Sequence, residues 1–259
     1  MLQRFFQKLS LATYRKTVTD NQQKIVDELR HLHQQLFVNN PVLVVGNVKM
    51  HLPLFYIDHI QKIVYSTRNF YEIETLQLLK KEFGQFESVI DIGTNIGNHM
   101  LYWCSEMGAG KVMCFEPNDF NRTVLLKNIE LNHLESIVTV QSCALGSESG
   151  KGVQSNFTLG NTGMNRVDKV GEGSASSTTD IKKLDDFPVN KVNFIKIDVE
   201  GFETEVLKGA LETIKRCKPV VMIEVFENNR AETDQIMAGC GYKRTITVED
   251  YNSIYVPVS

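Results

Sequence analysis

The chain has 259 residues, of which 42% are hydrophobic and 23% are charged, a composition typical of a globular protein with one substantial core and an extension. The net charge of −3 and the pI near 6.1 give no general basic field, so nucleic acid is not an expected partner. Five cysteines without a CxxC pair favour a reducing compartment, and no apolar run approaches the ~18 residues of a membrane-spanning helix, so we expect a cytoplasmic protein.

Residues 1–38 are predicted to form an N-terminal helical extension. Residues 1–16 carry four basic side chains and no acid among apolar ones, which is the pattern of a basic amphipathic helix. Such a helix can attach to a membrane surface or can pack on its own domain. In residues 21–37 the apolar side chains are spaced four, three and four apart, and this seam favours self-association or docking on the main domain: Ile25, Leu29, Leu32 and Leu36.

Residues 39–85 are predicted to lead into the main domain, with a short strand and turn near 41–47 and a helical pattern over 56–82. The main domain then spans 86–259. Its strands and helices alternate, which predicts an α/β fold with a parallel sheet. The expected strands are 88–91, 111–116, 137–142, 192–198 and 219–225, and the expected helices are 96–107, 119–132, 203–216 and 230–239.

Two parts of the main domain depart from this alternation. The interval 146–180 is rich in Gly, Ser, Thr and Asn, and we predict a hairpin or loop outside the sheet. Within it, the stretch 160–165 can cover a binding site or form an ordinary hairpin turn. The closing strands near 242–247 and 253–257 are joined by a segment too short for a parallel crossover, so the sheet should end in an antiparallel hairpin.

The segment 88–98 combines an apolar strand with a glycine-bearing turn that opens a helix. Asp91 ends the strand, Gly93 permits a tight turn and a close approach to a ligand, and Gly97 lets the helix start lie close to the strand. Glu116 lies 25 positions after Asp91 at the end of the next strand, where a carboxylate meets ribose hydroxyls in nucleotide-binding βαβ units. The GxxxG spacing differs from the GxGxxG of dinucleotide sites, so a cofactor without a pyrophosphate fits better.

Acidic residues recur where four strands of the predicted sheet end. Because the carboxyl ends of parallel strands line one crevice in an open α/β sheet, we expect these side chains to share a ligand site. They are Asp91, Glu116, Asp198 with Glu200, and Glu224 with Glu227.

In order and spacing, these motifs resemble those of FkbM-type methyltransferases over roughly residues 70–226. The matching segments are Ser88 to Asn98, Phe115-Glu116-Pro117-Asn118, Ala144-Leu145-Gly146 and Ile195 to Gly201, with support from Phe70-Tyr71-Glu72 and Val221 to Val225. The resemblance implies a Rossmann-like class I methyltransferase with helices on both faces of a mostly parallel seven-stranded sheet whose last strand is antiparallel. It also implies S-adenosylmethionine as cofactor.

The resemblance further assigns residues to the cofactor. Asp91, Gly93, Asn95 and Gly97 would form the loop against the methionine moiety, and Glu116 would bind the two ribose hydroxyls. Asn118 would flank the adenosine, Cys143 and Ala144 would border the adenine, and Asp198 would complete the set.

Methyl transfer depends mostly on positioning, and a hydroxyl acceptor also gains from a base. The candidates for that base are Asp198, Glu224 and Glu200, with Lys196 as an electrostatic helper. Crowding of Asp198, Glu200 and Glu203 should raise the pKa of at least one of them, although Glu203 also suits the first turn of a helix. His99 can reach the cleft or simply pack. No metal is expected, because Asp198 and Glu224 alone fall short of a coordination sphere for Mg²⁺.

We therefore expect O-methylation of a hydroxyl on a sugar, glycan or secondary metabolite, with the N-terminal segments providing peripheral membrane contact or homo-oligomerisation. Two alternatives stay open. One is a nicotinamide-dependent oxidoreductase, because a strand, a Gly-rich turn and a later acid also describe dinucleotide folds. The other is a non-catalytic scaffold with a degenerate cofactor fold.

Overall fold

The computed structural model describes residues 37–155, 160, 166–169 and 178–258, together with Lys16, Thr19, Asp20, Gln22, Lys24, Ile25 and Glu28. The chain divides into two compact units, residues 1–42 and 43–259. Most of the predicted amphipathic helix 1–16 and of the seam in 21–37 lies outside the described residues, as does most of the stretch 160–165. The predictions for these segments therefore stay predictions.

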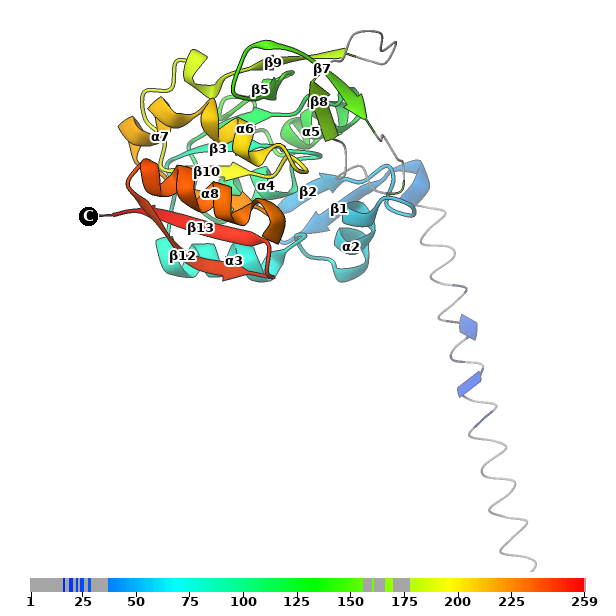
Figure 1. The fold of residues 1–259 in the computed structure, drawn as a ribbon. Helices are drawn as coiled ribbons and strands as arrows, with labels where there is room; N and C mark the ends of the chain where they lie inside the picture. Colours follow the sequence, from blue (N-terminus) through cyan, green and yellow to red (C-terminus); the bar gives the residue numbers. More distant parts are fainter. Residues whose placement is uncertain are drawn as a thin grey trace, which may run out of the picture. The chain divides into compact units, whose positions relative to one another are not determined.

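The second unit contains a seven-stranded sheet in the order β12-β13-β11-β10-β3-β4-β5 (Figure 1). The strands β3, β4, β5, β10 and β11 run parallel, and β13 is antiparallel to both β11 and β12. This arrangement confirms the predicted parallel sheet that ends in an antiparallel hairpin. The strands are β3 Ser88–Ile92, β4 Lys111–Phe115, β5 Val138–Gln141, β10 Phe194–Ile197, β11 Val220–Glu224, β12 Tyr242–Val248 and β13 Asn252–Pro257.

The helices of this unit follow the predicted positions with two exceptions. The helical pattern expected over 56–82 forms two helices, α2 His59–Thr67 and α3 Ile73–Phe83. The expected helix 203–216 is divided in two at Gly209 and Ala210, where the chain passes so close to Gly146 that a Cβ on Gly209 would lie 1.9 Å from the Gly146 carbonyl oxygen. The helices are α2 His59–Thr67, α3 Ile73–Phe83, α4 Asn98–Ser105, α5 Asp119–Leu131, α6 Glu203–Lys208, α7 Leu211–Cys217 and α8 Glu227–Gly239, with the 3-10 turn η2 Leu184–Asp186.

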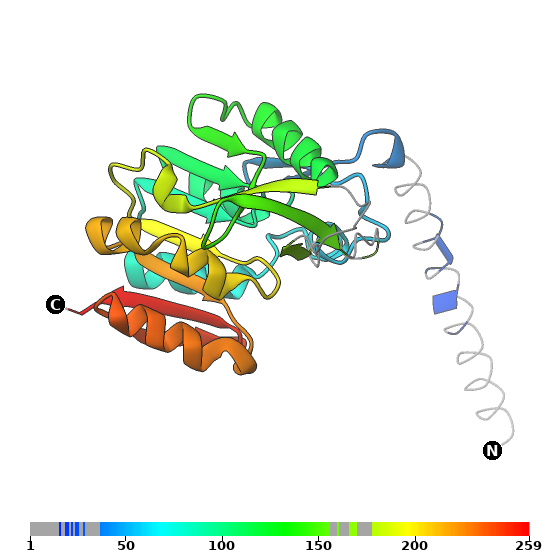
Figure 2. The same cartoon turned by 45° about the horizontal axis from the view of Figure 1, so that its top comes forward.

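Two smaller sheets accompany the main one. The interval after β5 forms a separate sheet with the strand order β6-β9-β7-β8, so it lies outside the main sheet as predicted (Figure 2). Within this sheet β7 is antiparallel to both β8 and β9. These strands are β6 Ala144–Leu145, β7 Gly150–Ser155, β8 Arg166–Lys169 and β9 Thr178–Lys182. Where one short strand was expected, β1 Val42–Val45 pairs with β2 Val48–His51.

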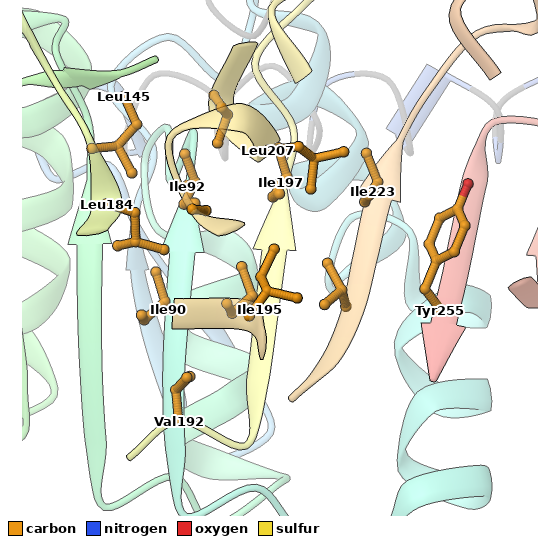
Figure 3. Packing of buried hydrophobic residues seen from close by; sticks show 14 of the residues in the cluster. Ile90, Ile92, Leu145, Leu184, Val192, Ile195, Ile197, Leu207, Ile223 and Tyr255 are labelled. Atoms are coloured by element: carbon orange, nitrogen blue, oxygen red, sulfur yellow. The ribbon is translucent and has the colours of Figure 1, made fainter. Parts of the chain in front are cut away.

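Alternation along β3 and β10 separates an apolar face of the sheet from a face that carries charges. Ile90, Ile92, Ile195 and Ile197 are almost fully buried in the core that α6, α7 and α8 cover, and Figure 3 shows them pointing to the same side. On the opposite face Phe194 contacts Trp103 of α4 at 5.0 Å between ring centroids. That face also carries Asp91 and Lys196, which are opposite each other in the register of the two strands.

Candidate functional site

A pocket with about 1150 Å³ of empty space, partly open to solvent, lies at the carboxyl ends of β3, β4, β10 and β11. This is the edge at which open α/β sheets bind ligands. The strand ends therefore bring together most of the residues that the sequence singled out. Those that line the pocket are Gly93, Asn95, Glu116, Asn118, Cys143, Ala144, Lys196, Asp198, Glu200, Glu224 and His99.

The glycine loop after β3 is fixed by contacts within the protein. Gly93 has a φ of +74°, its N–H donates to the carbonyl of Phe115 at 3.0 Å, and a Cβ there would lie 1.7 Å from the backbone oxygen of Asp198. Gly97 has a φ of +89°, and a Cβ there would lie 2.6 Å from Cδ1 of Leu125 in α5. Gly97 therefore permits close packing of α4 on α5 rather than on the strand, and it lies outside the pocket lining.

Asp91 is fully buried and also lies outside the pocket lining. One of its carboxylate oxygens accepts a hydrogen bond from the indole N–H of Trp103 at 3.0 Å, and the other lies 3.6 Å from Nζ of Lys196. Its backbone carbonyl accepts from the Thr94 hydroxyl at 2.7 Å. The carboxylate thus faces α4 and β10 behind the loop, where it holds Lys196 and the loop in place.

Glu116, which follows β4, is buried in the pocket wall with 5% of its surface exposed. Its two carboxylate oxygens each accept one backbone N–H at 2.8 Å, from Asn95 of the glycine loop and from Asn118. Burial nevertheless raises the pKa of Glu116 to about 7. Each oxygen keeps a lone pair for a further donor, so this carboxylate is fixed in position and ready to accept hydrogen bonds from a ligand.

The segment after Glu116 is also held firmly. Asn118 caps α5, because its side-chain oxygen accepts from the N–H groups of Phe120 and Asn121 at 3.0 Å. Arg122 donates to the carbonyls of Glu116 and Pro117. Next to this segment the wall is apolar, with Phe115, Cys143, Ala144 and Leu145, and burial raises the pKa of the Cys143 thiol. This side of the pocket suits a flat apolar ring.

The floor of the pocket holds a buried lysine between carboxylates. Nζ of Lys196 donates to the carbonyl of Gly93 at 2.8 Å and lies 3.0 Å from Asp198. Burial alone would lower the pKa of Lys196, but Asp198 and Asp91 outweigh burial and raise it. The lysine is therefore charged and compensates both acids.

Glu224 donates a hydrogen bond to the Asp198 carboxylate. Burial works against ionisation of Asp198, but Lys196 and a hydrogen bond from Glu224 outweigh it and hold the pKa of Asp198 below its ordinary range. Burial and the neighbouring Asp198 charge raise the pKa of Glu224 far above its ordinary range. At neutral pH Glu224 therefore carries the proton that it donates to the Asp198 carboxylate, and neither group is well suited to accept another.

Glu200 differs from this pair. It lines the pocket with a backbone φ of +56°, which is uncommon for a residue with a side chain. Burial, together with the charges of Asp198 and Glu203, raises its pKa to about 7, as the crowding of these acids predicted. Glu203 accepts the N–H of Gly201 at 2.7 Å in the first turn of α6, so its carboxylate is occupied by the helix start.

The sequence did not assign roles to several residues that the fold brings to the pocket. Tyr71 and His59 line it, and their rings meet edge to face. Glu72 lies 3.2 Å from Nε2 of His99 and accepts a hydrogen bond from Asn252 at 3.1 Å. Tyr71 and Glu72 belong to a sequence motif, but their partners are distant in the chain and only the folded chain shows them.

Two classes of feature are absent from the described part of the chain. No helix there is long and apolar enough to cross a bilayer. In the same residues no group of three or more histidines, cysteines and acids is placed to hold a metal ion.

Comparison with known proteins gives a family match over residues 91–244, to the family described as "Methyltransferase FkbM domain". The chain is 26% identical to "Methyltransferase sdnD" of Sordaria araneosa over 191 residues, which cover 61% of this chain and 74% of that protein. It is 28% identical to "Hexuronic acid methyltransferase AglP" of Haloferax volcanii over 151 residues, which cover 58% of this chain and 61% of that protein.

Among solved structures, a methyltransferase FkbM from Methylobacillus flagellatus aligns with a TM-score of 0.49 and 22% identity. The alignment covers 66% of this chain and 43% of that one.

Proposed function

Because the chain belongs to the FkbM methyltransferase family, we propose that it transfers the methyl group of S-adenosylmethionine to a hydroxyl of a sugar, a glycan or a secondary metabolite. S-adenosylmethionine supplies an electrophilic methyl group on a sulfonium. The family and the fold are those that the sequence motifs indicated.

The donor set of the pocket fits this cofactor. Glu116 offers a lone pair on each oxygen for the two ribose hydroxyls, and Asn95 and Asn118 keep its carboxylate in place. Cys143 and Ala144 belong to the apolar wall, which suits the adenine. Asp198 provides negative charge for the ammonium and the sulfonium, and the protonated Glu224 donates a hydrogen bond to it. The observation that carries the proposal is the buried Glu116 carboxylate, which is held by the glycine loop on the wall of the pocket.

We further propose that Glu200 removes the proton from the acceptor hydroxyl. A general base works best with a pKa near the working pH, and burial beside Asp198 brings the pKa of Glu200 to about 7. Asp198 is paired with Lys196, and Glu224 already carries a proton, so both are weaker candidates. Asp91 acts indirectly in this scheme, by positioning Lys196 from behind the glycine loop.

Calorimetry tests the cofactor part of the proposal. We expect S-adenosylmethionine and S-adenosylhomocysteine to bind the wild type and to bind Glu116→Gln at least tenfold more weakly, because a charge-assisted pair of hydrogen bonds to the ribose is lost. Glu130→Gln, at an exposed position of α5, is the matched control. Absence of binding by the wild type, or equal affinities of the two variants, would count against this site.

The acceptor is tested with radiolabelled methyl donor on sugar nucleotides, oligosaccharides, sugar acids and lipid-linked glycans. Sugar acids are included because one distant relative is described as a hexuronic acid methyltransferase. A panel without any labelled product, in the presence of measured cofactor binding, would remove the proposed acceptor class while leaving the cofactor site intact.

We also propose that residues 1–38 locate a cytoplasmic enzyme at a membrane surface through residues 1–16, or join copies of the chain through residues 21–37. The support is the basic amphipathic pattern and the apolar seam in the sequence. Deleting residues 1–38 should lower the number of chains per particle in solution or abolish liposome binding. A deleted form that keeps both the oligomeric state and the liposome binding of the full chain would refute the idea.

A further inference from the structure

His99 forms a buried pair with Glu72 at the pocket wall. It is the second residue of α4 and is 7% exposed. Its Nε2 lies 3.2 Å from a carboxylate oxygen of Glu72, and the other oxygen of Glu72 accepts a hydrogen bond from Asn252. Burial works against ionisation of Glu72, but the neighbouring His99 outweighs it and holds the pKa of Glu72 below its ordinary range. The imidazole therefore lies beside a charged carboxylate.

The cofactor contains an amino-acid carboxylate as well as an ammonium, and the charges around the pocket restrict where this anion can bind. Four acids line the pocket: Glu116, Asp198, Glu200 and Glu224. The described basic residues in the lining are Lys196, His59 and His99. Lys196 is already engaged by a backbone carbonyl and two carboxylates. His59 is exposed, where water weakens the attraction of an anion, whereas His99 is buried.

The position of His99 on α4 also suits an anion. The helix begins directly after the glycine loop, its N-cap Gly97 has no side-chain cap, and the helix dipole favours negative charge at the first turn. Three charged side chains lie around the imidazole. They are Glu72 at the start of α3, Lys196 of β10, and Asp198 directly after β10.

We propose that His99, positioned by Glu72, binds the carboxylate of the methionine moiety of the cofactor. Nε2 of His99 is buried and has no hydrogen-bond partner among the described residues, although a Glu72 carboxylate oxygen lies 3.2 Å from it, and the imidazole donates an N–H to the ligand carboxylate. This inference rests on the cofactor part of the proposed function.

Two ligands that differ in the amino-acid part test this assignment by calorimetry. S-adenosylhomocysteine has the carboxylate, whereas 5′-methylthioadenosine shares the adenosine and the sulfur but lacks the amino-acid group. For His99→Asn we expect the affinity for S-adenosylhomocysteine to fall roughly ten- to a hundredfold, and the affinity for 5′-methylthioadenosine to change by less than about twofold. Unchanged binding of 5′-methylthioadenosine also shows that the variant is folded.

Glu72→Gln should weaken the binding of S-adenosylhomocysteine by a smaller factor than His99→Asn and spare 5′-methylthioadenosine, because Glu72 acts only through the position of the imidazole. His133→Asn and Glu74→Gln, both at exposed positions, are the matched controls. Equal loss of both ligands in His99→Asn, or no loss of S-adenosylhomocysteine, would overturn the assignment. A wild type that binds neither ligand would instead overturn the cofactor site itself.

Discussion

Substitution of Gly93 by alanine tests how tightly the glycine loop and the end of β10 fit together. At a φ of +74° an alanine is strained, which costs about 1–2 kcal/mol. Its Cβ would also lie 1.7 Å from the backbone oxygen of Asp198, a distance that the backbone relieves only by moving apart. Overpacking of this kind costs about 1–3 kcal/mol, so we expect Gly93→Ala to lower the free energy of unfolding by about 2–5 kcal/mol.

Gly241 provides the matched control, because its φ is +80° and a Cβ there would meet nothing within 4 Å. Gly241→Ala should therefore cost only the backbone strain, about 1–2 kcal/mol. Urea unfolding of both variants measures the difference, which should appear in the midpoint at an unchanged slope. S-adenosylhomocysteine binding should weaken only in Gly93→Ala, since Asp198 must shift. If the two variants unfold within about 0.5 kcal/mol of each other, the close fit inferred here is wrong.

Three further predictions concern charged residues of the pocket. Burial raises the pKa of Glu116 to about 7, so the stability that its protonated form contributes is fully present below about pH 4.5 and is lost as the pH rises through 7. Urea unfolding should therefore show that the free energy of unfolding falls by about 2–3 kcal/mol between pH 5 and pH 8 in the wild type. Glu116→Gln should lack this loss. An equal pH slope in the two proteins would refute this. Glu200→Gln should slow methyl transfer by about 10²- to 10⁴-fold without weakening S-adenosylhomocysteine, and near-normal rates would exclude Glu200 as the base. Lys196→Met leaves Asp91 and Asp198 uncompensated and should cost about 3–5 kcal/mol in urea unfolding, whereas Lys191→Met, at an exposed position, should cost little.

The features that the sequence predicted well depend on local pattern. The short segment between the closing strands was enough to predict the hairpin of β12 and β13, because a parallel connection needs many more residues. The acids Glu116, Asp198 and Glu224 come together at the pocket because the carboxyl ends of parallel strands share one edge of the sheet.

The features that the sequence did not reveal depend on contacts between distant segments. Asp91 follows the expected motif, yet only the fold shows that Trp103 and Lys196 take up its carboxylate. α6 ends at Gly209, a residue type that often ends helices, but the close approach of Gly209 to Gly146 joins segments that are distant in the chain. The partner of His99 likewise lies on another helix, so neither periodicity nor spacing identifies Glu72.

The two faces of β10 have a consequence for how this protein can vary. Ile195 and Ile197 point into the apolar core, while Lys196 lies on the opposite face, opposite Asp91 of β3. Inserting or deleting a single residue before Ile195 would exchange the faces and force an ammonium group among isoleucines. Insertions or deletions within this strand should therefore prevent folding. In natural or laboratory variants, insertions should instead accumulate in the connections between strands.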